Sequence, residues 1–200
     1  MPGRPAFDLD AAEIVQAAVE ILGEQGLDAV SMRTVAARLG VSPVPLYSRV
    51  GNKESLLDAM SCHLLAGAVP DQDPDEPWQD YALRWATALR DRLLATTDLL
   101  RLLGHRTSPY VEVSRPLHAA LRAADFSPDA ATRACRLVVW TAVAGTLVEP
   151  GRFEGRGGTT RRTTGDAPAM SEAESDHLFK LHLRYLVEGI ERDTALPETP

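Results

Sequence analysis

The sequence predicts an all-α protein, in which an N-terminal three-helix domain with a helix-turn-helix is followed by a larger helical domain. Three observations support this fold class. Apolar residues recur three and four positions apart along most of the chain, as is typical of helices that pack on one face. No segment shows the strict alternation of apolar and polar residues that marks a half-buried strand. Glycines and prolines stand where the periodic segments end.

The composition is that of a globular protein. The chain has 200 residues, of which 44% are apolar, and a formal net charge of −7. Its apolar runs are too short for a membrane span and its N-terminus lacks an apolar signal region, so we expect a cytoplasmic protein without a membrane partner. Cys62 and Cys135 are widely spaced, which favours two buried thiols over a disulfide or a metal pair.

Positive charge is concentrated in one stretch, Ser31–Lys53, which holds four basic residues and no acid. Ser31 is a suitable cap for a first short helix, and Gly40 allows the left-handed turn that ends it. Ser42 is expected to cap a second helix, with Pro43 at its first position. The pattern predicts a helix-turn-helix, whose second helix presents its N-terminal residues to the major groove of DNA.

An ordinary helical hairpin with a solvated basic face would show the same pattern, so the stretch alone leaves that interpretation open. If an acidic chain such as this one reads DNA, it should rely on this local basic patch and on a specific site.

The other helices follow from the same periodicity. We expect helices at about Leu9–Glu24, Asn52–Ala68, Trp78–Ala95, Leu99–Leu103, Val111–Ala124, Ser127–Glu149 and Glu172–Arg192, in addition to the two within Ser31–Lys53. Prolines at 70, 74 and 77 break the fourth helix at a natural boundary in the chain. The segment Pro150–Ser171, rich in Gly, Thr and Arg, is expected to be a flexible loop, with an ordered functional element as the alternative.

The residues around the predicted turn resemble a known family. Leu39–Gly40–Val41–Ser42, Leu46–Tyr47, Asn52–Lys53–Glu54 and Leu56–Leu57 match, without a gap, the DNA-binding domain of the tetracycline-repressor (TetR) family. A weaker resemblance to the C-terminal domain of tetracycline-type repressors runs through Trp78–Gln79, Gly104, Arg106, Gly145–Glu149 and Phe179–Glu191. It implies a DNA-binding domain at residues 1–53 and a ligand-binding and dimerisation domain at residues 54–200.

The helix-turn-helix and the family resemblance together indicate the DNA contacts. Arg33 can reach a base edge or a phosphate, and Lys53 opens the next helix, where its charge and the exposed N–H groups favour phosphate. The prolines and the valine at the start of the second helix offer only apolar contact, so hydrogen-bonded base readout should be sparse. We expect DNA contacts from Arg33, Thr34, Ser42, Pro43, Val44, Pro45, Tyr47, Ser48, Arg49 and Lys53.

The final predicted helix carries two apolar stripes. One consists of Phe179, Leu183, Leu186 and Ile190, and the other of Leu178, Leu181 and Tyr185. A helix that is apolar on two stripes usually has two neighbours. In the family that the chain resembles, the last long helices of two subunits pack as a four-helix bundle, which implies a homodimer. We expect the first stripe and the helix Leu137–Leu147 to form its interface; burial of both stripes within one subunit is the alternative.

The resemblance implies a small-molecule effector, but not tetracycline with magnesium. Tetracycline-binding members hold the drug and the metal with histidines near the fourth and sixth helices, whereas the matching positions here are about Val69 and Leu102 or Leu103. These side chains cannot ligate a metal, so we expect no metal and no cofactor. A flat, largely apolar ligand would suit Trp85, Leu89, Leu102, Arg106 and Trp140, although each tryptophan is equally compatible with a plain core position.

Enzyme classes find little support. The five histidines are scattered, and the sequence has no ligand spacing for a metal, no phosphate-cradling glycine loop and no nucleophile elbow, so we expect no catalytic residues. The function that fits is a homodimeric transcriptional regulator, foremost a repressor, that binds a palindromic double-stranded DNA operator and is released by a small molecule. The alternatives are an activator of the same fold, or a helical-bundle ligand-binding protein or enzyme.

Overall fold

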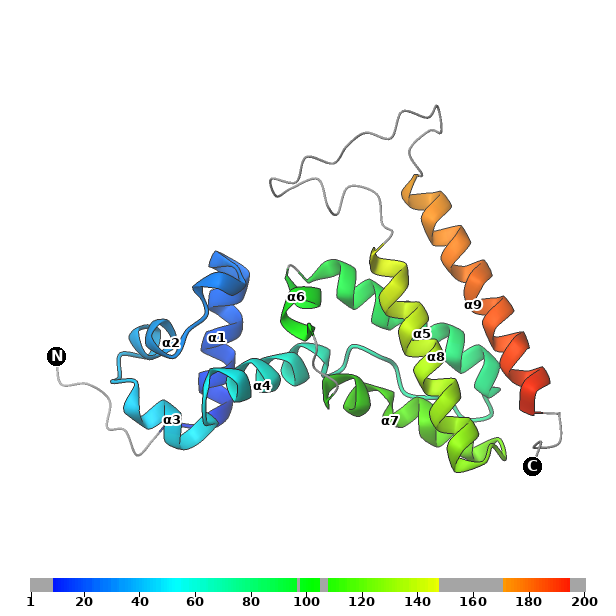
Figure 1. Cartoon of the computed structure of the whole chain (residues 1–200), viewed down its shortest axis with the longest axis horizontal. Helices are drawn as coiled ribbons and strands as arrows, with labels where there is room; N and C mark the ends of the chain where they lie inside the picture. Colours follow the sequence, from blue (N-terminus) through cyan, green and yellow to red (C-terminus); the bar gives the residue numbers. More distant parts are fainter. Residues whose placement is uncertain (1–8, 97, 105–107, 148–170, 195–200) are drawn as a thin grey trace. The chain divides into compact units, whose positions relative to one another are not determined.

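The computed structural model describes residues 9–96, 98–104, 108–147 and 171–194. Within these ranges the secondary structure is helical, which confirms the predicted fold class (Figure 1). The helices are α1 (Ala11–Gln25), α2 (Met32–Leu39), α3 (Val44–Val50), α4 (Lys53–Leu65), α5 (Trp78–Ala95), α6 (Leu99–Leu103), α7 (Ser108–Ala123), α8 (Pro128–Leu147) and α9 (Glu172–Thr194), with a 3-10 turn, η2, at Leu27–Ala29. Of the helices in the described ranges, none is long and apolar enough to cross a membrane.

The helices are divided between two compact units. The first unit contains residues 1–69 and 92–113, and the second contains residues 70–91 and 114–200. Helix α4 therefore belongs to the first unit, whereas the sequence suggested a functional boundary at residue 53. The physical reason is that α4 packs against α1 and fully buries Leu56 and Met60.

Helix α1 is the centre of the first unit. Its residues Ile14, Ala18 and Ile21 recur at helical spacing and are buried, and the helix packs against α2, α3 and α4. Complete burial of one isoleucine side chain stabilises a fold by about 1.5–3 kcal/mol. The helix predicted at about Leu9–Glu24 is thus confirmed, and α1 ends where Gly26 adopts a φ of +81°.

The other helix boundaries follow local chemistry. Helix α4 ends at Leu65, before the predicted Ala68, because Ala66 leaves the helical region with φ −59° and ψ 128°. Ser127 does precede α8 as a cap, since its Oγ accepts the N–H of Ala130 at 3.2 Å. Almost all of the loop predicted at 150–171 lies outside the described residues.

In the second unit, α9 packs on α8 with the stripe that contains Phe179. Phe179 approaches α8 at Gly145, where an added Cβ would lie 2.6 Å from the phenylalanine ring. The guanidinium of Arg90, a buried residue of α5, lies 4.5 Å from the centre of the same ring and pairs with Asp176 at 3.2 Å. A cation above an aromatic face is attracted to it, so Arg90 and Phe179 hold α5 and α9 together.

This packing corrects the predicted subunit interface. Phe179, Leu183 and Ile190 are at most 7% exposed in a single chain, so they cannot cover a second subunit. Phe179 lies against α8 and α5 because the absence of a side chain at Gly145 allows the close approach. Three of the four residues predicted for the interface are therefore part of the core of the second unit, while the fourth, Leu186, is partly exposed.

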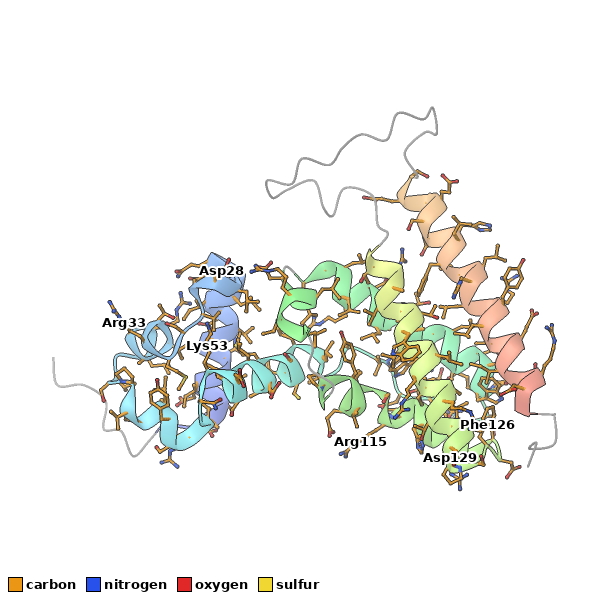
Figure 2. All side chains as sticks on the ribbon, viewed as in Figure 1. Asp28, Arg33, Lys53, Arg115, Phe126 and Asp129 are labelled. Carbon is orange, nitrogen blue, oxygen red and sulfur yellow. The ribbon has the colours of Figure 1, made fainter. Side chains whose placement is uncertain are left out.

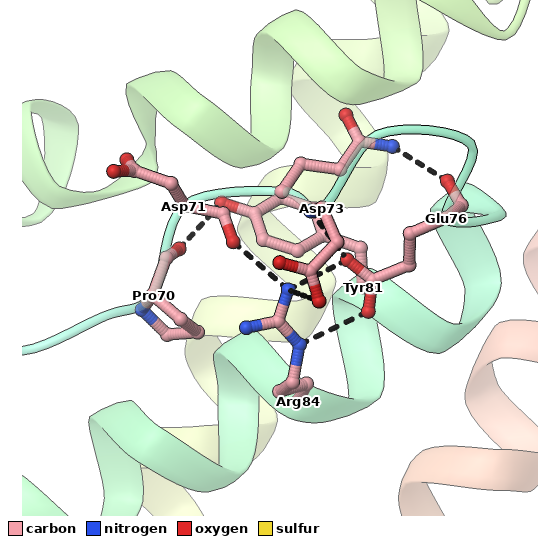
Figure 3. A network of polar contacts seen from close by, with 7 residues as sticks. Pro70, Asp71, Asp73, Glu76, Tyr81 and Arg84 are labelled. Carbon is pink, nitrogen blue, oxygen red and sulfur yellow. Dashed lines mark hydrogen bonds and ion pairs between the residues drawn. The ribbon is translucent and has the colours of Figure 1, made fainter.

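One arginine holds the segment that leads into α5 (Figure 3). Arg84 pairs through Nη2 with Glu76 at 2.6 Å and with Asp73 at 3.4 Å, and the same nitrogen donates to the carbonyl oxygen of Asp71 at 2.8 Å. The hydrogen bond from Arg84 holds the pKa of Glu76 below its ordinary value. These contacts fix the path of an acidic segment that would otherwise repel itself.

Tyr81 supports the same segment from one turn earlier in α5. Its buried hydroxyl donates to the carbonyl oxygen of Pro70 at 2.9 Å. Burial raises the pKa of Tyr81 to about 12, so the hydroxyl stays protonated and remains a donor at physiological pH.

Replacing Arg84 by Gln should lower the thermal midpoint at neutral pH, because Glu76 loses its charged partner. The folded-state pKa of Glu76 is lowered, so the contribution of the pair is present above the unfolded-state pKa and is lost as the pH falls through the folded-state pKa. Melts followed by circular dichroism from neutral to acid pH should show the gap between wild type and Arg84→Gln closing.

The matched control is Arg192→Gln, which breaks an exposed pair with Glu188 and should shift the midpoint less. A gap between wild type and Arg84→Gln that stays constant into the acid range would contradict the assignment of the stabilisation to Glu76.

Candidate DNA-binding interface and effector region

The start of α2 is fixed by a reciprocal cap. The Oγ of Ser31 accepts the N–H of Thr34 at 3.1 Å, and the Oγ1 of Thr34 accepts the N–H of Ser31 at 3.0 Å. The same Thr34 hydroxyl lies 2.8 Å from the carbonyl oxygen of Ala29, to which it donates. The predicted cap is confirmed. The hydroxyl proton of Thr34, a predicted DNA contact, is used within this cap, although the residue itself is exposed.

The turn between α2 and α3 has the predicted glycine. Gly40 adopts φ +68° and ψ 27°, the left-handed conformation that ends α2. The predicted start of the next helix is wrong by one position: α3 begins at Val44, with Pro43 at its N-cap, and no side chain caps it. Pro43 already has helical dihedrals, φ −66° and ψ −22°, and its carbonyl oxygen accepts the N–H of Leu46 at 3.1 Å. Ser42 is therefore exposed and does not cap α3.

Helix α3 buries one side and exposes the other. Leu46 is completely buried, whereas Val44 and Tyr47 are 75% and 54% exposed. Arg49 and Ser48 are also exposed, and Ser48 donates its hydroxyl to the carbonyl oxygen of Pro45 at 2.8 Å. The exposed side therefore combines apolar and cationic groups but leaves few neutral hydrogen-bond donors free.

Lys53 stands at the first position of α4. Asn52 caps this helix, since its Oδ1 accepts the N–H of Ser55 at 2.9 Å. Lys53 is exposed, and the N–H groups of a helix N-terminus add to its positive charge. This is a suitable position for a phosphate.

Arg38 differs from the other basic residues of the stretch because it is neutralised by α1. Its guanidinium binds both oxygens of Glu24 and lies 3.4 Å from Glu20. These contacts raise the pKa of Arg38 and lower that of Glu24. Glu20 and Glu24, four apart on α1, place two carboxylates on one side of that helix, but the sequence alone does not link them to Arg38.

The remaining cations, Arg33, Arg49 and Lys53, form no ion pair with any described residue and are exposed (Figure 2 labels Arg33 and Lys53). All three belong to the first unit. We use the term reading face for the exposed residues Arg33, Val44, Tyr47, Arg49 and Lys53. The reading face combines unpaired positive charge with apolar side chains.

Helix α6 is tied to the turn that follows α1. Asp98, just before α6, has a left-handed backbone (φ +59°), which is strained in a residue with a side chain. Its carboxylate accepts the N–H of Leu27 at 3.1 Å and pairs with Arg101 at 3.2 Å, and Arg101 pairs with Asp28 at 2.9 Å. We call these four residues the α6 clamp. The sequence pattern gave no signal for it, because its partners are far apart along the chain.

The predicted ligand-binding residues occupy different environments. Trp85 and Leu89 are completely buried in the second unit, and Leu102 is buried in the first. Arg106 lies outside the described residues. Trp140 is 65% exposed on α8 in a single chain, unlike the buried Trp85, and its part in a ligand site stays a prediction.

The second unit exposes apolar side chains on α8 and α9. Leu137 and Trp140 on α8 are 39% and 65% exposed, and Leu178 and Tyr185 on α9 are 47% and 64% exposed. Leu178 and Tyr185 are two helical turns apart and so lie on one side of α9. We call these four residues the α8–α9 face. It includes members of the second predicted stripe of the final helix rather than the first.

The described residues contain no group of three or more His, Cys, Asp or Glu side chains placed to hold a metal ion. Cys135 is buried and its pKa is raised to about 12 by desolvation, as expected of a thiol in the core. Burial also raises the pKa of Cys62. Neither thiol is activated as a nucleophile.

Comparison with known proteins identifies the family. Residues 14–60 match the model of the bacterial regulatory proteins of the tetR family. Over 193 residues the chain is 31% identical to the class A tetracycline repressor protein from transposon 1721 of Escherichia coli, with 88% of each chain covered. The chain belongs to the TetR family. It is thus a helix-turn-helix transcriptional regulator of a non-enzymatic family.

Solved structures of TetR-family proteins share the fold. ActR of Streptomyces coelicolor in complex with actinorhodin superposes with a TM-score of 0.73 and 26% identity, covering 94% of this chain and 97% of ActR. BioQ with its natural double-stranded DNA operator superposes with a TM-score of 0.65 and 28% identity, covering 92% of this chain and 98% of BioQ. The similarity therefore extends through both units.

Replacing Asp98 by Ala should destabilise the protein by about 1–3 kcal/mol, because the N–H of Leu27 loses its acceptor. Asp98→Asn keeps a carbonyl oxygen in place and tolerates the left-handed backbone, so it should lose less. Asp98→Gly relieves the backbone strain without restoring the acceptor and should fall between the two. Urea denaturation gives the three free energies of unfolding; an Asp98→Ala variant as stable as wild type would rule out the α6 clamp.

Proposed function

We propose that this TetR-family protein is a transcriptional repressor that binds a palindromic DNA operator as a homodimer and leaves it when a small, largely apolar ligand binds. The observation that carries the proposal is the reading face, where Arg33, Arg49 and Lys53 have no ion pair among the described residues although the chain is acidic overall. Exposed cations concentrated in a helix-turn-helix stretch are the electrostatic footprint of a nucleic-acid site. Repression rather than activation is supported by the class A relative, which is itself a repressor.

In this proposal α3 enters the major groove, with Val44 and Tyr47 toward the base edges. Arg33 reaches a guanine or a phosphate, and Lys53 binds a phosphate at the N-terminus of α4. Arg49 adds a backbone contact. Thr34 and Ser48 act mainly through local structure, because their hydroxyl protons are donated within the chain. Ser42, Pro43 and Pro45 border the exposed side. BioQ, which shares the fold, is bound to a double-stranded operator.

The partner of the α8–α9 face is a second copy of the chain in this proposal. Four large apolar side chains on two packed helices are unusual on a monomer surface. A self-complementary face on α8 and α9 produces a two-fold dimer. Such a dimer presents two copies of α3 about one turn of DNA apart, or a multiple of it, which matches a palindromic site.

The effector is proposed to contact Trp85 and Leu89 of the second unit, while the parts of Leu102 and Arg106 stay predictions from the sequence. A flat ligand suits an aromatic and aliphatic lining. ActR, which shares the fold, binds actinorhodin, an effector other than tetracycline. Magnesium-bound tetracycline is not proposed, because Val69 and Leu102 or Leu103 stand where tetracycline-binding members carry histidines and cannot ligate a metal.

Two elements of the first unit would couple effector and DNA. Helix α4 begins at Lys53 on the reading face and packs against α6 near its other end. The α6 clamp joins α6 to the turn after α1. A ligand that favours another position of α6 would therefore move helices of the first unit. Its effect on DNA affinity cannot exceed its difference in affinity for the two arrangements.

The DNA-binding site is tested by removing positive charges from the protein and measuring the affinity for a selected operator. Lys53→Ala should weaken binding to all sequences and lower the salt slope by about one. Arg33→Ala should weaken operator binding by about 1–3 kcal/mol and relax the preference at one position per half-site. Fluorescence anisotropy at several salt concentrations measures both effects.

Arg38→Ala is the matched control, because Arg38 is paired with Glu24 and lies in the same stretch. Its salt slope should equal that of wild type. Wild-type affinity and slope in both Arg33→Ala and Lys53→Ala would show that the reading face is misplaced.

The dimer interface is tested by placing a charge on each side of α9. Tyr185→Glu should give a folded monomer in sedimentation, because a carboxylate buried without a partner in the interface costs several kcal/mol. Tyr185→Phe keeps the apolar surface and should remain dimeric. Leu183→Glu should unfold the protein, since Leu183 is only 1% exposed within one chain. A stable dimer of Tyr185→Glu would exclude the α8–α9 face.

A further inference from the structure

The first turn of α3 is poor in hydrogen-bond donors. Pro43 and Pro45 lack a backbone N–H, and the N–H of Leu46 is bonded to the carbonyl oxygen of Pro43 at 3.1 Å. The helix sequence VPLYSRV contains no Asn, Gln, Asp or Glu, the side chains that recognise adenine or cytosine through hydrogen bonds. Base recognition by this helix must therefore come largely from other contacts.

The side chains that α3 offers instead are apolar or aromatic. Val44 is 75% exposed and Tyr47 is 54% exposed, and their spacing of three places them on one side of the helix. They are the large hydrophobic residues left exposed among the described parts of α1, α2, α3 and α4. Ser48 follows on the helix, but its hydroxyl proton is donated to Pro45.

The positive charge of the surface around Val44 indicates which kind of partner binds there. No acid occurs in the stretch Ser31–Lys53, and Arg33, Arg49 and Lys53 are unpaired among the described residues. A polyanion is therefore the favoured partner of this surface. In the major groove of DNA, the apolar group on a base edge is the 5-methyl group of thymine, which contacts small aliphatic side chains.

We propose that Val44 is a specificity-determining residue that recognises the 5-methyl group of one thymine in each half-site of the operator. This inference rests on the proposed DNA-binding function and adds the chemistry by which the site is chosen. The methyl group distinguishes thymine from cytosine at a position where α3 has no amide or carboxylate to do so. Arg33 supplies a hydrogen-bonded contact to a different part of the half-site.

The test uses the full chain and an operator obtained by selection from a random duplex pool. Each thymine of the selected site is replaced in turn by deoxyuridine, which removes the methyl group and retains base pairing. At one thymine per half-site, the replacement should weaken binding about fourfold, the equivalent of one buried methyl group. Replacement in both half-sites should weaken binding on the order of 15-fold if the half-sites are independent.

Two variants assign the effect to Val44. Val44→Ala should fold, because the side chain is 75% exposed, and should bind the thymine and deoxyuridine operators with nearly equal affinity. Val44→Gln should select a site with adenine at or beside that position, since an amide forms a bidentate pair with adenine. Val111→Ala, which changes a valine 58% exposed on α7, should retain the full deoxyuridine effect.

The outcomes separate this inference from the proposed function. Tight binding to a selected operator with no deoxyuridine effect at any thymine would overturn the role of the methyl group and leave the DNA-binding function intact. A deoxyuridine effect that persists in Val44→Ala would assign the contact to another residue and overturn the role of Val44. Failure of the wild-type protein to enrich any sequence would overturn the proposed function itself.

Discussion

The orientation of α3 depends on the complete burial of Leu46 within the first unit. A helix of seven residues, such as α3, is too short to be stable in isolation, because nucleation of a helix is costly and each further residue adds little. Leu46 is completely buried, and α3 packs against α1 and α4. With this side fixed, Val44 and Tyr47 have to face outward. The same burial that stabilises α3 therefore determines which of its side chains are exposed on the reading face.

In the second unit, α9 is likewise divided into a buried side and an exposed side. Helix α9 uses Phe179 and Leu183 to pack within the chain, and this packing leaves Leu178 and Tyr185 exposed. The close approach at Gly145 sets the rotation of α9 about its axis, since only a glycine admits the ring of Phe179. One apolar stripe of α9 thus packs within the unit, and residues of the other stripe stay exposed.

Much of the first unit was predictable because its signals are local. The Ser31 cap, the left-handed Gly40 and the apolar spacing of α1 each depend on residues within one or two helical turns. The start of α3 was misjudged because Ser42 has the chemistry of a cap, while the dihedrals of Pro43 let that residue begin the helical path. Arg38 counts as a free cation in the sequence, yet it is neutralised by Glu24 from another helix.

The rest of the candidate sites was less predictable because it depends on tertiary packing. The periodicity of α9 shows two apolar stripes but not which of them packs within its own chain. That depends on Gly145, which is distant in sequence and admits the ring of Phe179. Trp140 and Trp85 have the same apolar character in the sequence, whereas one is 65% exposed and the other is completely buried. The α6 clamp joins Leu27 and Asp98 across 71 positions of chain, and neither residue signals the contact by itself.

The central claim is that two copies of the reading face bind one symmetric DNA site. Hydroxyl-radical footprinting of the full chain on a selected operator tests it most directly, because the cleavage pattern locates each reading head on the backbone. Two protected half-sites related by two-fold symmetry are expected, with centres about one helical turn or a multiple of it apart. Protection of a single half-site by a stable monomer, or uniform protection without sequence preference, would contradict it.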